Sequence, residues 1–298
     1  MDEHHDSHRV QRSASKRALL LTLVLAGGYM VAEIVGGLIT NSLALLADAG
    51  HMFSDVAALG LSLFAVWIAE RPPTPQRTYG YYRTEILAAL VNGAALIAVS
   101  IYIFIEAYHR LHQPPEVMGA VMMWVAVGGL IVNLLGLWIL RTGRDENLNV
   151  RGAWLHVLTD ALGSVGAIVA GTLIWVLAWN WVDPVVSVLI GLLVVYSAWR
   201  LVMESVHVLM EGAPRGIDVD EVRQTIVGTP GVIGVHDLHV WTIASGLDSL
   251  SAHVVAEEVE SHADLLKKLR RALHERFGID HITIQIEPDD FDERPTLV

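Results

Sequence analysis

The sequence contains no cysteine, few charged residues and little positive charge. Of 298 residues, 17% are charged, and 20 Lys and Arg face 32 Asp and Glu. Without thiols, neither disulfide bonds nor thiolate metal sites can form, so any metal must be held by histidine, carboxylate or backbone oxygen. The acidic excess also disfavours nucleic acid as a partner.

The chain is instead rich in apolar residues, at 53% with a mean hydropathy of +0.47, which is too apolar for an ordinary soluble domain. A helix of about twenty apolar residues crosses the ~30 Å hydrocarbon core of a lipid bilayer. Because the first apolar segment has no cleavage site of small residues after it, we interpret it as a retained span rather than a signal peptide. The sequence predicts a six-helix transmembrane domain over residues 18–210, with spans at 18–39, 43–69, 84–109, 117–140, 152–178 and 182–209.

Positive charge is distributed unevenly between the predicted loops. The loops after the first, third and fifth spans carry only Arg110. The positive-inside rule therefore places both chain termini in the cytoplasm. The basic residues that support this orientation precede the first span or follow the second and fourth: Arg9, Arg12, Lys16, Arg17, Arg71, Arg77, Arg83, Arg141, Arg144 and Arg151.

The chain changes character at Glu211, where a linker rich in glycine and proline begins. Beyond it the periodicity predicts a helix at 218–227, strands at 232–242 and 250–257, an amphipathic helix at 262–277 and a strand at 281–287. This α-β-β-α-β order predicts a small α+β domain over residues 211–291, with its helices on one face of an antiparallel or mixed sheet. We expect residues 1–17 to form a histidine-bearing cytoplasmic tail at the N-terminus. Residues 292–298 are expected to form a short tail at the C-terminus.

Two histidine–aspartate pairs lie inside the apolar segments, His51 with Asp55 and His156 with Asp160. Positions i and i+4 share one face of a helix, so each pair presents a nitrogen and a carboxylate in one direction. Ionisable groups inside a membrane cost at least ~2.5 kcal/mol each and persist when paired or when they line a polar path. Two such helices facing each other would supply the four tetrahedral ligands that Zn²⁺ favours. The alternative is that these are hydrogen-bonded core residues.

Asp48 lies on nearly the same helix face as Asp55, either as a further ligand or as a residue that lines the approach to the site. Two aspartates and two neutral histidines would balance the charge of a divalent ion. An empty site would leave two buried carboxylates unbalanced, so it should take up protons. If the site opened alternately to the two sides of the membrane, this competition would exchange protons for metal.

Several segments resemble the cation diffusion facilitator family, specifically its zinc-exporting ZitB/CzcD-like branch. The resemblance covers nearly the whole chain. It rests on residues 41–51 (NSLALLADAGH), Tyr79-Gly80 with Arg83, residues 147–153 (NLNVRGA), 211–214 (EGAP), 238–241 (LHVW) and 283–287 (TIQIE).

The resemblance implies a homodimeric proton antiporter that exports zinc, and also cadmium in some relatives, across a bacterial-type cytoplasmic membrane. Each protomer would carry six transmembrane helices and a cytoplasmic ferredoxin-like, metallochaperone-like domain. The family's transport site falls on His51, Asp55, His156 and Asp160, and two histidines with two aspartates imply a preference for zinc. Such a protein is a secondary transporter and not an enzyme.

Further positions follow from the same resemblance. The family places cytoplasmic metal ligands at His236, His253, His262 and Glu287, and His281 lies on the polar face of the same last strand. Gln285 stands where some relatives have histidine, so we expect one zinc ion per protomer, or two held weakly, unless these are ordinary surface histidines. The loop at 74–83 contains neither His nor Asp, which predicts that a second zinc site known in some relatives is absent.

Arg83 and Glu211 match a charge pair that links the third and sixth helices of relatives near the cytoplasmic surface. The pair would act as a hinge between the protomers, or it is an ordinary exposed ion pair worth under ~1 kcal/mol.

Two other classes of function are compatible with parts of the sequence. One is a zinc-responsive sensor or scaffold whose membrane part is only an anchor, although an anchor has no use for buried ionisable pairs. The other is an intramembrane metalloenzyme, although catalytic zinc normally keeps an open coordination position and here a fourth ligand is available without a separate general base.

Overall fold

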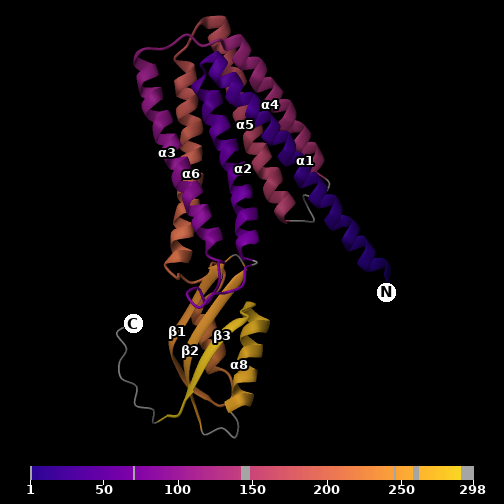
Figure 1. The fold of residues 1–298 in the computed structure, drawn as a ribbon, viewed down its shortest axis with the longest axis vertical. Coiled ribbons are helices and arrows are strands. Elements are labelled where there is room, and N and C mark those ends of the chain that lie inside the picture. The colour runs from indigo at the N-terminus through magenta and orange to yellow at the C-terminus, as the bar shows by residue number, and fades with distance from the viewer. Residues whose placement is uncertain (1, 70, 142–147, 245, 258–261, 290–298) are drawn as a thin grey trace. The chain divides into compact units, whose positions relative to one another are not determined.

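The computed structural model describes residues 2–69, 71–141, 148–244, 246–257 and 262–289; the side chains at 2–20, 55, 58–59, 61–63, 65–66, 69 and 148–153 are not described. Six long helices come first, followed by a short α+β segment (Figure 1). The long helices are α1 (Asp2–Thr40), α2 (Leu43–Ala69), α3 (Thr84–His112), α4 (Gly119–Leu140), α5 (Leu148–Leu177) and α6 (Val182–Leu209).

Among the described residues, five helices are long and apolar enough to cross a membrane. They are α3, α4, α6, the Leu21–Thr40 part of α1 and the Trp154–Leu177 part of α5. The structure therefore has a helical transmembrane domain, while a total of six spans stays a prediction. The backbone of α1 is already helical at Asp2, so the segment predicted as a separate tail continues the first helix.

The chain divides into two compact units, and the first comprises residues 1–61 and 91–201. In this unit α1 packs on α4, and α4 packs on α5. Helices α4 and α5 approach closely because glycines line their contact. A Cβ atom added to Gly119 would lie 2.6 Å from the Trp175 nitrogen, and one added to Gly171 would lie 2.8 Å from the Met123 nitrogen. Small residues are what allow membrane helices to pack backbone against backbone.

Replacing Gly171 by alanine is expected to destabilise the α4–α5 pair by about 1–3 kcal/mol. The added methyl group would clash with backbone atoms of α4, which cannot move aside as a flexible side chain can. The matched control is Gly166→Ala on the same helix, where nothing lies within 4 Å of the added carbon. Thermal unfolding of both variants in detergent tests this. Equal melting temperatures would contradict the close packing.

The second unit comprises residues 62–90 and 202–298 and contains the α+β segment. Its elements are α7 (Val219–Val227), β1 (Val232–Ala244), β2 (Leu247–Ala256), α8 (His262–Phe277) and β3 (His281–Glu287). Asp218 caps α7 by accepting a hydrogen bond from the Asp220 nitrogen at 2.9 Å. The strand order is β1-β2-β3, with β2 antiparallel to β1 and parallel to β3. The predicted α-β-β-α-β order is confirmed, and the sheet is of the mixed kind.

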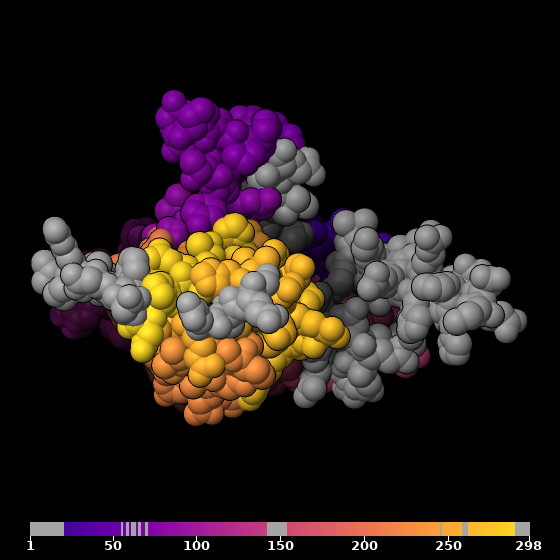
Figure 2. Space-filling view, turned by 90° about the horizontal axis from the view of Figure 1, so that it is seen from below, coloured from indigo at the N-terminus to yellow at the C-terminus, as the bar shows by residue number. Residues whose placement is uncertain are grey.

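The sheet and its two helices enclose a single apolar core. Leu250, Val254, Leu269 and Leu273 are fully buried in it, and the three isoleucines of β3 pack against it. In the space-filling view the yellow C-terminal residues lie beside the orange residues of the same segment (Figure 2). Along β3 the residues alternate between exposed and partly buried until Glu287, which is buried. One face of the sheet is thus left free to carry polar side chains.

Candidate metal-binding sites

In the membrane unit, α2 and α5 bring together His51, His156 and Asp160. The Asp160 carboxylate lies between the two rings, with Oδ1 3.8 Å from His51 Nε2 and Oδ2 3.6 Å from His156 Nε2. The ring centroids are 5.5 Å apart, and one potential ligand atom from each residue lies within 4.8 Å of the others. The side chain of Asp160 is 11% exposed, against 21% for His51 and 43% for His156.

These distances suit an ion placed between the three groups. The His and Asp atoms are too far apart for hydrogen bonds, whereas a zinc ion needs each of them at about 2.0–2.2 Å from itself. The fourth predicted ligand, Asp55, belongs to α2, but its side chain lies outside the described residues. The structure thus joins one member of the first predicted pair to both members of the second.

A cavity of about 490 Å³ opens beside the three residues, between α2, α5 and α6. His51 and Asp160 line it, together with Asp48, while α6 contributes mostly apolar side chains such as Leu189 and Leu193. Asp48 is buried and is not a member of the three-residue group. That it lines the approach to the site stays a prediction.

The sheet of the second unit carries another cluster on its polar face. Glu287 of β3, which is 3% exposed, contacts two histidines, His236 Nε2 at 3.0 Å and His253 Nδ1 at 3.0 Å. The rings of these histidines are 5.2 Å apart, because His236 and His253 are direct partners in the antiparallel ladder. Gln285 donates to the same carboxylate at 2.7 Å.

Two predicted ligands lie outside this cluster among the described residues. His262 is exposed at the start of α8, and His281 is exposed at the start of β3, where its ring contacts Tyr79. Asp237, which the sequence analysis missed, lies beside the cluster, with its carboxylate 3.0 Å from His239 Nε2 and 3.8 Å from His253 Nε2. Its backbone is left-handed with φ of 50°, at an irregularity of the β1–β2 ladder between His236 and His239.

Comparison with known proteins identifies the architecture that holds these two sites. The profile described as the cation efflux transmembrane domain matches residues 19–210, and that described as the cation efflux protein cytoplasmic domain matches residues 214–289. The chain belongs to the cation efflux family. It is therefore a multi-pass membrane cation transporter, as the resemblance predicted, and the alternative of a metalloenzyme is wrong.

Relatives within the cation efflux family match this chain over nearly its whole length. It is 46% identical over 287 residues to the "Cadmium, cobalt and zinc/H(+)-K(+) antiporter" of Bacillus subtilis, covering 95% of this chain and 92% of that protein. It is 46% identical over 274 residues to the "Metal cation efflux system protein CzcD" of Cupriavidus metallidurans, covering 92% and 87%. The "Zinc transporter ZitB" of Escherichia coli is 44% identical over 285 residues, covering 95% and 91%.

One solved structure is the metal-bound C-terminal domain of the CzcD transporter from Cupriavidus metallidurans. It is 43% identical, covers 24% of this chain and 99% of that one, and superposes with a TM-score of 0.23.

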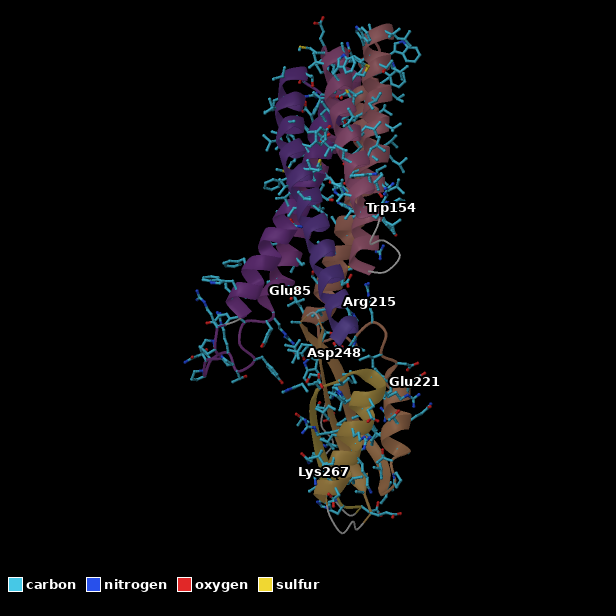
Figure 3. The ribbon with its side chains drawn as sticks, turned by 90° about the vertical axis from the view of Figure 1, so that its right-hand side faces the viewer. Glu85, Trp154, Arg215, Glu221, Asp248 and Lys267 are labelled. Atoms are coloured by element: carbon cyan, nitrogen blue, oxygen red, sulfur yellow. The ribbon has the colours of Figure 1, made fainter. Side chains whose placement is uncertain are left out.

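The charge pair predicted for this cation efflux protein is present in the second unit. Arg83 Nη2 donates to Glu211 Oε1 at 2.8 Å, with side chains 39% and 60% exposed. Neighbours of both residues are labelled in Figure 3: Glu85 is two positions after Arg83, and Arg215 is four positions after Glu211. At that exposure solvent screens the pair, so its direct contribution to stability is under ~1 kcal/mol.

Sequence reasoning also passed over a buried acid in the first helix. Glu33 is 1% exposed and accepts a hydrogen bond from the Tyr29 hydroxyl at 2.8 Å, and the same hydroxyl lies 3.1 Å from the Val125 carbonyl oxygen. A single carboxylate inside an apolar span is itself a signal of a functional or paired group. That signal was available in the sequence.

Proposed function

We propose that this chain is a proton-coupled exporter of Zn²⁺, and secondarily of Cd²⁺, from the cytoplasm across the cytoplasmic membrane of a bacterium. The observation that carries the proposal is the meeting of His51, His156 and Asp160 beside a cavity in the membrane unit. Nitrogen and carboxylate ligands in this number suit zinc, whereas harder ions favour more oxygen ligands. The names of the relatives as zinc, cadmium and cobalt transporters support the same substrate class.

In this proposal Asp55 completes a tetrahedral site with His51, His156 and Asp160, and Asp48 lines the approach. The bound ion would be neutralised by two carboxylates, so the loaded site carries no net charge inside the membrane. When the ion leaves, protons neutralise the same groups, which couples zinc in one direction to protons in the other. Each transport cycle then needs the site to face the two sides of the membrane in turn.

The proposal extends to the organisation of the chain. Residues 18–210 form six spans with both termini in the cytoplasm, residues 1–17 precede them and residues 292–298 follow the cytoplasmic domain at 211–291. Two copies form a homodimer through that domain. His236, His253 and Glu287 hold one regulatory zinc ion per protomer, since their contacts already bring two nitrogens to one carboxylate. The Arg83–Glu211 pair acts as a hinge that holds the two protomers together.

Transport by the purified protein in proteoliposomes tests this function. With a zinc-sensitive dye inside and an imposed pH gradient, zinc should accumulate in the vesicles, and the accumulation should collapse when a protonophore removes the gradient. Cadmium and manganese are measured side by side with zinc, in wild type and in His51→Asp. Substituting oxygen for nitrogen is expected to lower the preference for zinc at least about tenfold.

The proposal fails if the wild-type protein moves no zinc under a pH gradient. The assignment of metal preference to the ligand set fails separately, if His51→Asp transports the three metals in the wild-type ratio.

A further inference from the structure

Asp183 is a fully buried carboxylate that belongs to neither metal-binding cluster. It is the second residue of α6 and is 0% exposed. A buried carboxylate is strongly destabilising unless hydrogen bonds and an opposite charge compensate for lost hydration. Its partners therefore indicate what it does in the fold.

Three of these partners belong to the start of α2. Asp183 Oδ2 accepts from the Leu43 nitrogen at 2.8 Å, and Oδ1 accepts from the Ala44 nitrogen at 3.2 Å and from the Ser42 hydroxyl at 2.6 Å. The first N–H groups of a helix have no partners within the helix and carry partial positive charge. Ser42 Oγ also accepts from the Leu45 nitrogen at 3.3 Å. A carboxylate of α6 thus completes the N-terminal cap of α2.

Arg110 of α3 closes the network from the other side. Its Nη1 lies 3.9 Å from Asp183 Oδ2 and donates to the Asn41 carbonyl oxygen at 2.6 Å. A second donor, Nη2, reaches Asn41 Oδ1 at 3.1 Å. Asn41 has a left-handed backbone with φ of 56° in the two-residue connection between α1 and α2. The network therefore fixes the place where the chain enters α2.

The position of α2 matters because this helix carries His51. Leu43 and His51 are eight positions apart, which is ~12 Å along a helix. On the other side, four residues connect α6 to α5, the helix that carries His156 and Asp160. Ala44 and Leu45 also pack in one apolar cluster with Ala170 and Ile174 of α5. Asp183 thus joins the start of one ligand-bearing helix to the connection that follows the other.

We infer that Asp183 is a positioning residue for transport: it holds α2 at the height and rotation that bring His51 to the ion bound by α5. The inference rests on the proposed function, because it assumes that His51 is a ligand of the transported ion. A displacement of about 1 Å in a reacting group can cost a factor of ~100. Asp183 therefore acts on affinity and metal preference through α2, without touching the ion.

The test is Asp183→Asn in the full-length protein in proteoliposomes, with transport of zinc and of cadmium measured per folded molecule. Asparagine keeps the volume but loses the charge and one acceptor, so the apparent KM for zinc is expected to rise at least about tenfold. The preference for zinc over cadmium should fall as well, because ligands held farther apart suit the larger cadmium ion. Glu106→Gln is the matched control: it removes the negative charge of the group that accepts from Arg110 at 2.8 Å, and it should stay within about twofold of wild type.

A purely structural role would lower the yield and the melting temperature and leave the KM and the metal preference of the folded protein unchanged; that result overturns the inference. If Asp183→Asn does not fold, Ser42→Ala decides, because it removes the 2.6 Å hydrogen bond and leaves Asp183 in place. A rise of about threefold in the KM for zinc supports positioning, and a wild-type KM overturns it. Failure of the proposed function would look different, since the wild-type protein itself would then move no zinc.

Discussion

Replacing Asp160 by asparagine is expected to reduce zinc transport at least about 100-fold, the largest effect of any single substitution in the membrane unit. Among the residues whose side chains the structure describes, Asp160 is the one whose two oxygens face both histidines, at 3.8 Å and 3.6 Å. Loss of a group that only orients a metal ligand already costs about 10–100-fold in affinity. Loss of a charged ligand removes more, because the bound ion would keep an uncompensated positive charge inside the membrane.

The measurement is initial zinc flux into proteoliposomes under a fixed pH gradient, with the melting temperature of each variant recorded. Asp160→Asn should melt no lower than wild type, since it removes a buried charge, so its loss of flux is not a loss of fold. Thr159→Val is the control from the next position, because its hydroxyl bonds the Leu155 carbonyl oxygen of its own helix at 3.0 Å. Its flux should stay within about threefold of wild type. Wild-type flux in Asp160→Asn would refute the membrane site.

A second large effect is expected in the cytoplasmic domain, where Glu287→Gln should weaken zinc binding at least about 100-fold. The carboxylate contacts His236 and His253 at 3.0 Å each, so it is the anionic member of the set. Glutamine offers a neutral oxygen in the same place and adds an amide donor that points at groups meant to bind a cation. The three-residue ligand set then carries no negative charge to oppose that of Zn²⁺.

This affinity is best measured by competition with a chelator in the Asp160→Asn background, so that zinc held in the membrane does not contribute. The matched control is His281→Ala on the same strand, which removes a histidine outside the cluster and should leave the affinity unchanged. Equal affinities for the Glu287 and His281 variants would refute the assignment. A lower zinc affinity in His281→Ala would instead show that His281 is a zinc ligand.

The elements of this fold follow from local patterns, which is why the sequence predicts them. Apolar length indicates the membrane helices, and alternation indicates the strands, so α8 and β3 begin and end where the periodicity places them. The i, i+4 spacing within each histidine–aspartate motif is equally local, because it places both members on one helix face. What the spacing cannot give is which helices meet, and the contacts of Asp160 with both rings supply that information.

The features that the sequence analysis missed depend on contacts between distant segments. Asp237 reaches His253 because the β1–β2 ladder is irregular near it, and no residue pattern announces that irregularity. Asp183 looks like an ordinary residue at the start of a helix until its partners, about 140 positions away, are seen. Glu287 was expected on the polar face and lies there, but His236, His253 and Gln285 contact its carboxylate, and this burial arises from the neighbouring strands.

The order of the sheet has a consequence for a chain that has no cysteine. Among the described strands, β3 lies at an edge and pairs with β2 alone, so one ladder and the packing of its isoleucines attach it to the domain. His236 and Glu287 are 51 residues apart in the sequence. An ion bound by both would close that long loop, as a disulfide would, and reduce the entropy of the unfolded chain. Unlike a disulfide, this cross-link would form and break with the concentration of free metal around the domain, independently of the redox conditions.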